Sequence, residues 1–429
     1  MAVIGFAGTI AVVTGLIHLY LWKRLVRDTT RRGRWRQVGS VAALALAVLV
    51  PVTLVTSRSG VTWLVWLVWP GYLWLAVMFY LLVVMLVLEI PMLVARLTLR
   101  RRPAAAPTGP ADTEPATESL VTEPALVGGG PAEPPAPAAP PAPPAAEPGH
   151  DPARRLLLAR GAAIFAGLTA TGLTGYGVST ALGPPRIDRV SIPLARLPRA
   201  LDGLRIATVS DIHIGPLLGR AHTQRIVDLI NGLDADLVAV VGDLVDGPVA
   251  ELGPAAAPLA DLRARHGSFF VTGNHEYYAG AEEWVTEVDR LGLQVLENER
   301  REIVTPRGVL DVAGVNDPAG EGTGATGGPD FDRALGDRDP DRPVVLLAHQ
   351  PVLAQEAAKY GVDLQLSGHT HGGQIVPFNL LVGLEQPVVS GRGNVDGTEV
   401  YVTNGAGFWG PPVRVGAPPQ ISLIELRSP

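Results

Sequence analysis

Cysteine is absent from this chain of 429 residues, which excludes disulfide bonds and metal sites with thiolate ligands. Any metal site must therefore use nitrogen and oxygen ligands. An excess of positive charge is absent as well, because 35 lysine and arginine residues face 41 aspartate and glutamate residues, a formal net charge of -6. We therefore expect no nucleic-acid partner.

Apolar sequence is concentrated at the N-terminal end of the chain. Hydrophobic residues make up 47% of the sequence, and three apolar runs are each long enough to span a bilayer: 2–22, 38–56 and 61–95. Arginine clusters follow the first and third runs. We therefore predict a transmembrane region of about three helices over residues 1–100. A buried helical core is the alternative, and an arginine cluster between the runs argues against it.

The next two segments differ in composition. Residues 101–153 are rich in proline and alanine with scattered glutamates. Such a composition buries too little apolar surface to fold, so we predict a disordered linker. Residues 154–183 form a weaker apolar run that opens with Arg154-Arg155. This run is either a fourth transmembrane helix or a signal anchor of the twin-arginine type.

The basic residues also predict an orientation. If the runs cross the membrane in alternation, Lys23–Arg36, Arg96–Arg102 and Arg154-Arg155 all fall on one side. Cytoplasmic loops carry the excess of lysine and arginine, so this side is the cytoplasmic one. We predict a multi-pass protein of the cell membrane whose C-terminal domain, residues 184–429, is extracytoplasmic.

From residue 184 onward the sequence has the pattern of an alternating α/β domain. Short buried strands are predicted at 204–209, 237–241, 268–272, 310–315, 344–348, 362–366, 400–403 and 421–426. Helices are predicted at 222–233, 254–265 and 281–291.

The stretch Ser367–Gly373 places two histidines, His369 and His371, among glycines directly after a predicted strand. Alternate residues of extended backbone point the same way, so both imidazoles can face one point. Imidazole is the commonest protein metal ligand near neutral pH. Taken alone, the stretch fits a metal site and a polar turn equally well.

The ends of the other predicted strands decide between these two interpretations. Four further strands are followed by aspartate, asparagine or histidine: Asp211 and His213, Asp243, Asn274 and His275, and His349. In open α/β sheets, ligands collect at the carboxyl ends of the strands. Five such loops together favour a shared metal site over solvated turns.

These motifs resemble, in order and spacing, those of the calcineurin-like metallophosphoesterases. They are Asp211-Ile212-His213, Gly242–Asp246, Gly273–Glu276, His349 and Gly368–His371. The resemblance covers roughly residues 200–429 and implies an α/β fold, a sandwich of two mostly mixed sheets flanked by helices. The tail Gly405–Arg414 is similar to that of a narrower subgroup, the membrane-anchored or exported bacterial members.

The resemblance also implies a centre with two divalent metal ions. The implied ligands are Asp211, His213 and His371 for one ion, Asn274, His349 and His369 for the other, and Asp243 as the bridge. Ligation by nitrogen and oxygen suits Mn, Fe, Zn or Ni. A hydroxide between the metals would be the nucleophile.

Further residues have implied or open roles. The histidine matching His275 acts in the family as general acid or stabilises the transition state, and Asn274 would also contact phosphate. Asp246 and Glu276 either orient ligands or are surface acids. Arg414 either binds substrate phosphate or is a surface arginine at a strand edge.

The implied function is hydrolysis of a phosphoester or pyrophosphate bond at the membrane. The substrate would be a phosphate ester, and the membrane location makes a lipid-linked or envelope phosphate a reasonable one. A metal-binding membrane scaffold or transport component without turnover is the alternative. The complete ligand set and the presence of His275 argue against it.

Overall fold

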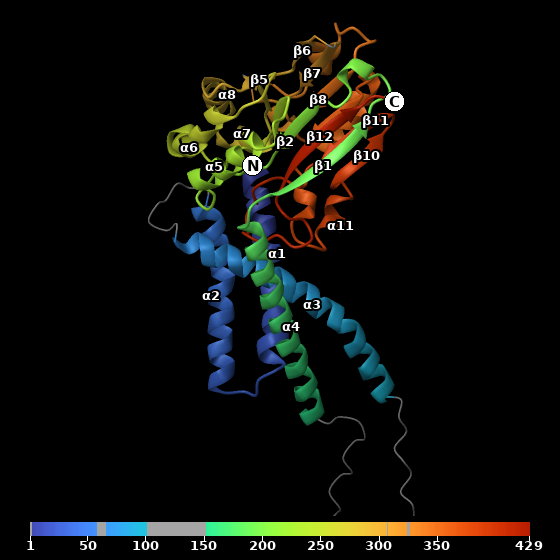
Figure 1. Cartoon of the computed structure of the whole chain (residues 1–429). Helices are drawn as coiled ribbons and strands as arrows, with labels where there is room; N and C mark the ends of the chain where they lie inside the picture. Colours follow the sequence, from blue (N-terminus) through green and yellow to red (C-terminus); the bar gives the residue numbers. More distant parts are fainter. Residues whose placement is uncertain (1, 58–65, 101–151, 307, 324–326) are drawn as a thin grey trace, which may run out of the picture.

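The computed structural model describes residues 2–57, 66–100, 152–306, 308–323 and 327–429 (Figure 1). It shows a group of long helices and, above them, a sandwich of two sheets. The predicted linker lies outside the described residues up to position 151, as does the start of the third apolar run.

Four long helices form the N-terminal part: α1 (Ala2–Trp22), α2 (Arg34–Thr56), α3 (Val68–Arg100) and α4 (Pro152–Ala181). Among the described residues, three segments are long and apolar enough to cross a membrane, namely Arg34–Thr56, Val68–Val94 and Arg154–Ala181. Only 11% of the most apolar window of the first and of the last is buried inside the protein. Such exposed apolar surface is stable in lipid and unfavourable in water.

The long helices are held together by apolar contacts and by one ion pair. Ala76 of α3 and Ala166 of α4 are fully buried in the same apolar cluster. Glu89 of α3 accepts hydrogen bonds from Tyr20 Oη at 2.8 Å and from Arg24 Nε at 2.6 Å. An ionised carboxylate among apolar helices is costly unless it is paired. The pair with Arg24 therefore stabilises α3 against the end of α1.

The C-terminal part is built on two six-stranded mixed sheets. The first has the order β1 (Arg186–Pro193), β12 (Gln420–Arg427), β2 (Arg205–Val209), β3 (Leu237–Val241), β4 (Ser268–Val271) and β5 (Gln294–Val295). The second has the order β10 (Gly391–Val395), β11 (Thr398–Val402), β9 (Leu364–Ser367), β8 (Val344–Leu347), β7 (Gly308–Gly314) and β6 (Glu299–Thr305). Strands β2 to β5 are parallel to one another, and so are β11, β9, β8 and β7.

Helices cover the outer faces of both sheets, so the domain has four layers. The helices of this part are α5 (Arg220–Asn231), α6 (Val249–Ala256), α7 (Asn274–Ala279), α8 (Ala281–Arg290), α9 (Phe331–Leu335) and α10 (Ala354–Ala357). A further short helix, α11 (Asn379–Val382), has no buried residue and covers neither sheet. β3 is an uninterrupted apolar run because both of its faces are buried. Leu237 and Val241 pack in the core between the sheets, whereas Val238 and Val240 pack in the cluster that includes α5, α6 and α8.

Each of the eight predicted strands is present within a few residues. The strands that the sequence pattern missed are β1, β5, β6 and β10, and these are the four edge strands of the two sheets. β1, β6 and β10 carry charged residues or glycine, which blunt pairing with other chains and erase the apolar signal, and β5 has only two residues. The helix predicted at 254–265 is wrong. α6 begins earlier, at Val249, and the chain continues as a short 3-10 turn, Ala257–Asp261, that contains Pro258.

One contact joins the sandwich closely to the long helices. The backbone N–H of Arg414 donates to the carbonyl of Gly177 in α4 at 2.9 Å. Val413 and Val415 lie so close to Gly177 that a side chain there would overlap them. Glycine is therefore required at this crossing.

We expect Gly177→Val to separate α4 from the 413–415 segment and to destabilise the protein by about 1–3 kcal/mol, the usual cost of overpacking. The midpoint of thermal unfolding in detergent would measure this. Gly172→Val is the matched control, because a Cβ at Gly172 in the same helix meets nothing within 4 Å. An equal loss in both variants would contradict the assigned contact.

Candidate metal centre

The predicted site residues lie at the carboxyl ends of strands from both sheets. The loops after β2, β3 and β4 meet the loops after β8 and β9 at one edge of the sandwich. The structure brings together the seven predicted ligands and His275: Asp211, His213, Asp243, Asn274, His275, His349, His369 and His371.

A first cluster consists of Asp211, His213 and His371, all buried, with ligand atoms within 4.8 Å of one another. Nε2 of His371 lies 3.3 Å from Oδ1 of Asp211 and 3.1 Å from Nε2 of His213. A carboxylate oxygen and two ring nitrogens thus converge as the ligands of one divalent ion would.

A second cluster consists of Asp243, His349 and His369, again within 4.8 Å. Nε2 of His349 lies 3.2 Å from Oδ2 of Asp243, and Nδ1 of His369 lies 3.0 Å from Oδ1 of Asn274. The same Oδ2 of Asp243 is 3.9 Å from Nε2 of His213. Asp243 therefore stands between the two clusters, where a bridging carboxylate would stand.

The donor set fits two divalent cations. Nε2 of His349 is fully buried and has no hydrogen-bond partner among the described residues, although a carboxylate oxygen lies beside it. A cation placed between this nitrogen and the Asp243 carboxylate would have both as ligands. Its other nitrogen, Nδ1, lies 2.8 Å from the carbonyl of Val241, which orients the ring.

The backbone is bent into an unusual conformation at this centre. Nine non-glycine residues of the described chain have a positive φ, and five of them are predicted ligands: Asp211, His213, Asp243, His369 and His371. Left-handed backbone at residues other than glycine costs of order 1–3 kcal/mol and gathers at functional sites. Here it turns each side chain toward the common point.

Two glycines allow this close approach. Gly242 (φ +73°) precedes Asp243, and a Cβ there would overlap Gly273 and His349. Gly405 (φ +77°) lies against Asp211 in the same way. A side chain at either position would push a ligand loop outward.

Asp246 and Glu276 orient the centre and are not surface acids. Oδ1 of Asp246 lies 2.8 Å from Nδ1 of His213 and 2.7 Å from Nδ1 of His275, so one carboxylate holds both rings. Glu276 is fully buried and accepts backbone N–H bonds from Asp243, Leu244 and Gly273 at 2.6–3.0 Å. It ties the loop after β3 to the loop after β4.

Arg414 fits neither of its two sequence interpretations. It is fully buried, so it is neither a surface arginine nor exposed to a substrate phosphate. Its Nη2 donates to Nδ1 of His371 at 2.9 Å, and its remaining donors bond to backbone carbonyls, among them those of Asn404 and Ala417. Arg414 therefore positions His371.

Burial and neighbouring charges separate the histidines into two kinds. Burial disfavours charge on His213, but the carboxylates of Asp246 and Asp243 outweigh this effect and raise its pKa to about 9. Burial, with the charge of His349 beside it, lowers the pKa of His369 to about 4. Burial and the Arg414 guanidinium hold the pKa of His371 well below its ordinary value. Without a cation, His369 and His371 are therefore neutral at pH 7, whereas His213 is protonated and would have to release its proton to bind one.

Two aromatic residues flank the opening of the centre, and the sequence pattern missed one of them, Tyr278. Tyr278 and Trp409 are exposed aromatic residues whose ring centroids lie 5.5 Å and 6.2 Å from that of His275. Gln374 holds Trp409 in place by accepting from its backbone N–H and donating to its carbonyl, both at 3.0 Å. The only sequence signal of Tyr278 is its position three residues after His275.

Two mixed sheets with ligand-rich loops at one edge define a class of protein, the two-sheet α/β sandwich with an Asp/His/Asn metal centre. The chain belongs to the calcineurin-like phosphoesterase family. The family model matches residues 204–373. Members of this family normally bind divalent metals.

Three relatives illustrate the match. A transmembrane protein with metallophosphoesterase domain from Danio rerio is 40% identical to this chain. The match covers 59% of this chain and 60% of the Danio rerio protein. An uncharacterized metallophosphoesterase of Helicobacter pylori is 38% identical, with 59% of this chain and 68% of that protein covered. One from Aquifex aeolicus is 32% identical, with 56% and 92% covered. The similarity therefore extends to a vertebrate, and this chain spans less than two thirds of that relative.

If each histidine of the His369-Thr370-His371 pair serves a different ion, single variants will lose different metals. We expect His369→Ala and His371→Ala each to lower the metal content by about one ion per chain, because each removes one ligand from one cluster only. Elemental analysis of the purified full chain measures the content. His266→Ala, a turn histidine outside the centre, is the control, and loss of both ions from either single variant would contradict the division.

Proposed function

We propose that this chain is a membrane-anchored phosphohydrolase that cleaves a phosphoester or pyrophosphate bond with two bound divalent metal ions. In this proposal residues 1–100 and 154–183 anchor the chain in the membrane, and residues 101–153 form the linker between these two segments. Residues 184–429 form the catalytic domain. One observation carries it: ligand atoms from five loops gather in two adjacent groups, Asp211 with His213 and His371, and Asp243 with His349 and His369, and Asn274 lies 3.0 Å from His369.

The proposed ligand assignment follows the two clusters. The proposed ligands are Asp211, His213 and His371 for the first ion, Asn274, His349 and His369 for the second, and Asp243 between them. Mn, Fe, Zn and Ni all suit this set. When bound, the two ions supply Lewis acidity that activates water and neutralises charge on the phosphate.

The remaining residues prepare the substrate. His275 lies at the opening, 14% exposed, and its Nδ1 is held by Asp246. This position supports a role in donating a proton to the leaving-group oxygen. Asn274 begins α7 directly beside it and is proposed to contact phosphate as well. The carboxylate of Asp246 contacts both His275, the proposed proton donor, and His213, a proposed metal ligand, and so holds the two rings in a fixed relative position.

The test of this function compares purified full chain with two variants. We expect wild type with manganese to cleave one or more of a phosphate monoester, a diester and a pyrophosphate. Asp243→Asn should lower kcat by about 100-fold or more, since it weakens the bridge, and His275→Ala by about 10²–10⁴-fold, the usual share of general acid catalysis.

His266→Ala again serves as the control and should keep wild-type activity. If wild type, Asp243→Asn and His275→Ala are equally inert with several metals, the chain is a metal-holding scaffold and the enzymatic proposal fails. Turnover that survives Asp243→Asn would exclude the proposed bridge.

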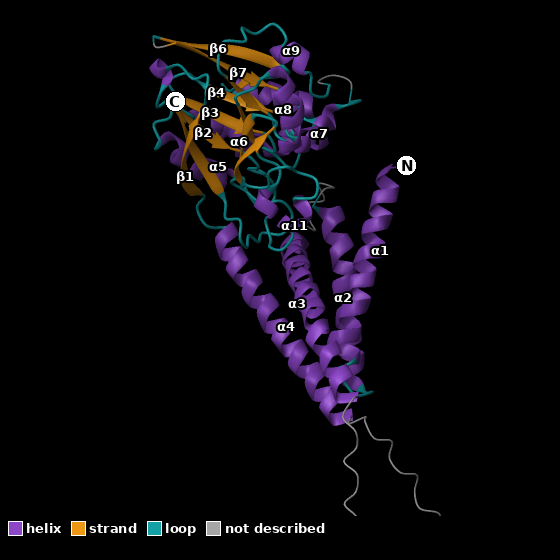
Figure 2. Ribbon diagram, turned by 90° about the vertical axis from the view of Figure 1, so that its right-hand side faces the viewer, coloured by secondary structure: helices purple, strands orange, loops and turns teal. Residues whose placement is uncertain are grey.

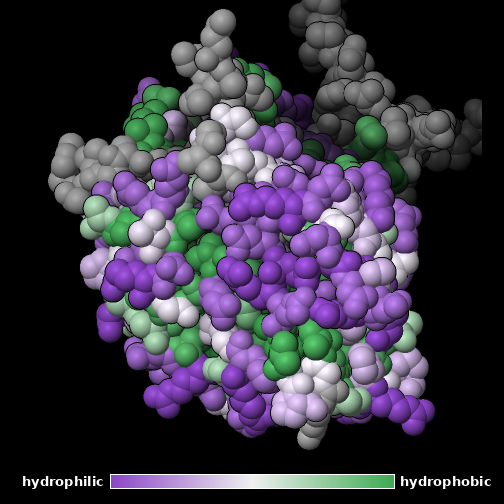
Figure 3. Space-filling view, turned by 90° about the horizontal axis from the view of Figure 1, so that it is seen from above, coloured by the Kyte–Doolittle hydropathy of each residue, from purple (hydrophilic) through white to green (hydrophobic). Residues whose placement is uncertain are grey.

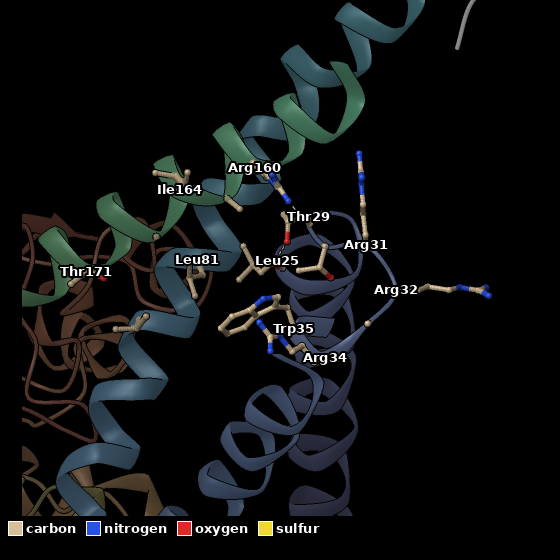
Figure 4. A pocket seen from close by; sticks show the side chains of 15 residues that line it. Leu25, Thr29, Arg31, Arg32, Arg34, Trp35, Leu81, Arg160, Ile164 and Thr171 are labelled. Atoms are coloured by element: carbon tan, nitrogen blue, oxygen red, sulfur yellow. Dashed lines mark hydrogen bonds between the residues drawn. The ribbon is translucent and has the colours of Figure 1, made fainter. Parts of the chain in front are cut away.

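The catalytic domain is proposed to be extracytoplasmic, and the distribution of arginines supports this. A cavity of about 970 Å³ at the far end of the helices is lined by Arg31, Arg32, Arg34 and Arg160 (Figure 4). Arg160 of α4 donates to the carbonyl of Thr29 at 3.0 Å, so the α1–α2 connection and the start of α4 lie at the same end. That end is remote from the sandwich (Figure 2). Arginine-rich ends of membrane helices are the cytoplasmic ones.

A reporter enzyme that is active only in the cytoplasm, fused after Pro429, should therefore be silent. The same reporter fused within residues 103–150 should be active, because the proposed linker is cytoplasmic. The opposite pair of results would reverse the topology without affecting the proposed chemistry.

The substrate is proposed to be a lipid-linked or envelope phosphate ester. The support is location. The segment that carries Arg414, which contacts ligand His371, also bonds to Gly177 of α4. The centre thus lies beside the ends of the proposed membrane helices.

A further inference from the structure

The catalytic domain exposes its large apolar side chains very unevenly. Among the described residues of 184–429, eight large apolar side chains are exposed, and six of them belong to one surface: Val376, Phe378, Leu380, Leu381, Leu384 and Trp409. We call this surface the α11 patch. The face that is turned away from the long helices is mostly hydrophilic (Figure 3). Contiguous exposed apolar side chains mark a surface that another apolar phase covers.

The α11 patch lies where the domain meets the long helices. Ile375, Val413 and Val415 pack into the apolar cluster of α1, α3 and α4. The backbone N–H of Val376 donates to the carbonyl of Val415 at 3.0 Å, so the patch starts from this junction. Figures 1 and 2 show α11 on the side of the sandwich that faces the helices.

The patch is also continuous with the opening of the metal centre. It begins three residues after Gly373, the end of the turn that carries His371. Gln374 bonds to both backbone groups of Trp409, and the Trp409 ring faces His275 at a centroid distance of 6.2 Å. Through Gln374, Trp409 is thus tied to the segment where the patch begins, and its ring lies beside the proposed proton donor.

From this continuity we propose that the α11 patch lies in the membrane interface and is the entry path for the substrate. A phosphate ester carried on a long acyl or isoprenoid chain keeps its chain in the bilayer, against Phe378, Leu380 and Leu384. Its phosphate reaches His275 and the metal ligands past Trp409. Tryptophan suits this boundary because its ring is amphipathic. The inference names the substrate class of the proposed phosphohydrolase and rests on that function.

Immersion of the patch is testable without turnover, because the chain has no cysteine and one introduced thiol is unique. Leu380→Cys and Val304→Cys are a matched pair, since both native side chains are 69% exposed. Val304 lies on β6, at the far end of the domain from the helices (Figure 1). Each full-length variant carries an environment-sensitive fluorophore and is reconstituted in phosphatidylcholine vesicles.

Spin-labelled phosphatidylcholine should quench the fluorophore at position 380 at least about threefold more than at position 304, because quenching requires contact with the acyl region. Equal quenching at the two positions overturns the immersion of the patch.

Entry through the patch is tested with matched substrates. The two substrates are the hexadecyl and the ethyl ester of nitrophenyl phosphate, which differ only in the length of the alkyl group. The hexadecyl ester is supplied in phosphatidylcholine vesicles. The variant Leu380→Ser/Leu381→Ser/Leu384→Ser should lower kcat/KM for the hexadecyl ester by about tenfold and leave the ethyl ester unchanged, since only the chain contacts are lost. Unchanged ethyl ester hydrolysis also shows that the variant is folded.

The outcomes separate the inference from the function. Equal rates of variant and wild type on the hexadecyl ester, or wild-type cleavage of the ethyl ester alone, overturn the entry path and leave the phosphohydrolase intact. The same comparison of a long-chain with a short-chain substrate is made for a phosphate diester, a monoester and a pyrophosphate. If wild type cleaves none of these substrates, the proposed function fails. The quenching experiment then still decides the immersion.

Discussion

Convergence of buried polar side chains on one point between two sheets is the constraint on which the rest of this structure depends. Aspartates and histidines removed from water are unfavourable unless they are paired, hydrogen-bonded or bound to a cation. The fold meets this demand with left-handed backbone at the ligands and with glycine where two loops touch. Glu276, buried under three backbone N–H groups, then holds the loops together.

The sandwich is well suited to this task, because parallel strands deliver their carboxyl ends to the same edge. Each sheet alone would supply part of the ligand set. Facing the sheets across one apolar core brings His349 of the second sheet to Asp243 of the first at 3.2 Å. The core between the sheets therefore positions the site as much as it stabilises the fold.

Arg414 joins the metal centre to the long helices. Its guanidinium contacts the ring of His371, while its backbone N–H bonds to Gly177 of α4. The α11 patch begins at the same junction, since Val376 pairs with Val415. The segment 413–415 therefore contacts α4, His371 and the start of the α11 patch. A domain detached from α4 would lose one support of His371, a predicted metal ligand.

The sequence by itself determined the interior strands and the polar residues after them, because buried parallel strands are continuous apolar runs and their ends are marked by glycine, aspartate and histidine. It did not determine the four edge strands, because β1, β6 and β10 are interrupted by charged residues or glycines and β5 has only two residues. Only the tertiary structure decided that Arg414 is buried under His371, that Asp246 holds His213 and His275 together, and that the α11 patch adjoins the helices. These facts depend on contacts between residues far apart in the chain, and such contacts leave no local pattern to read.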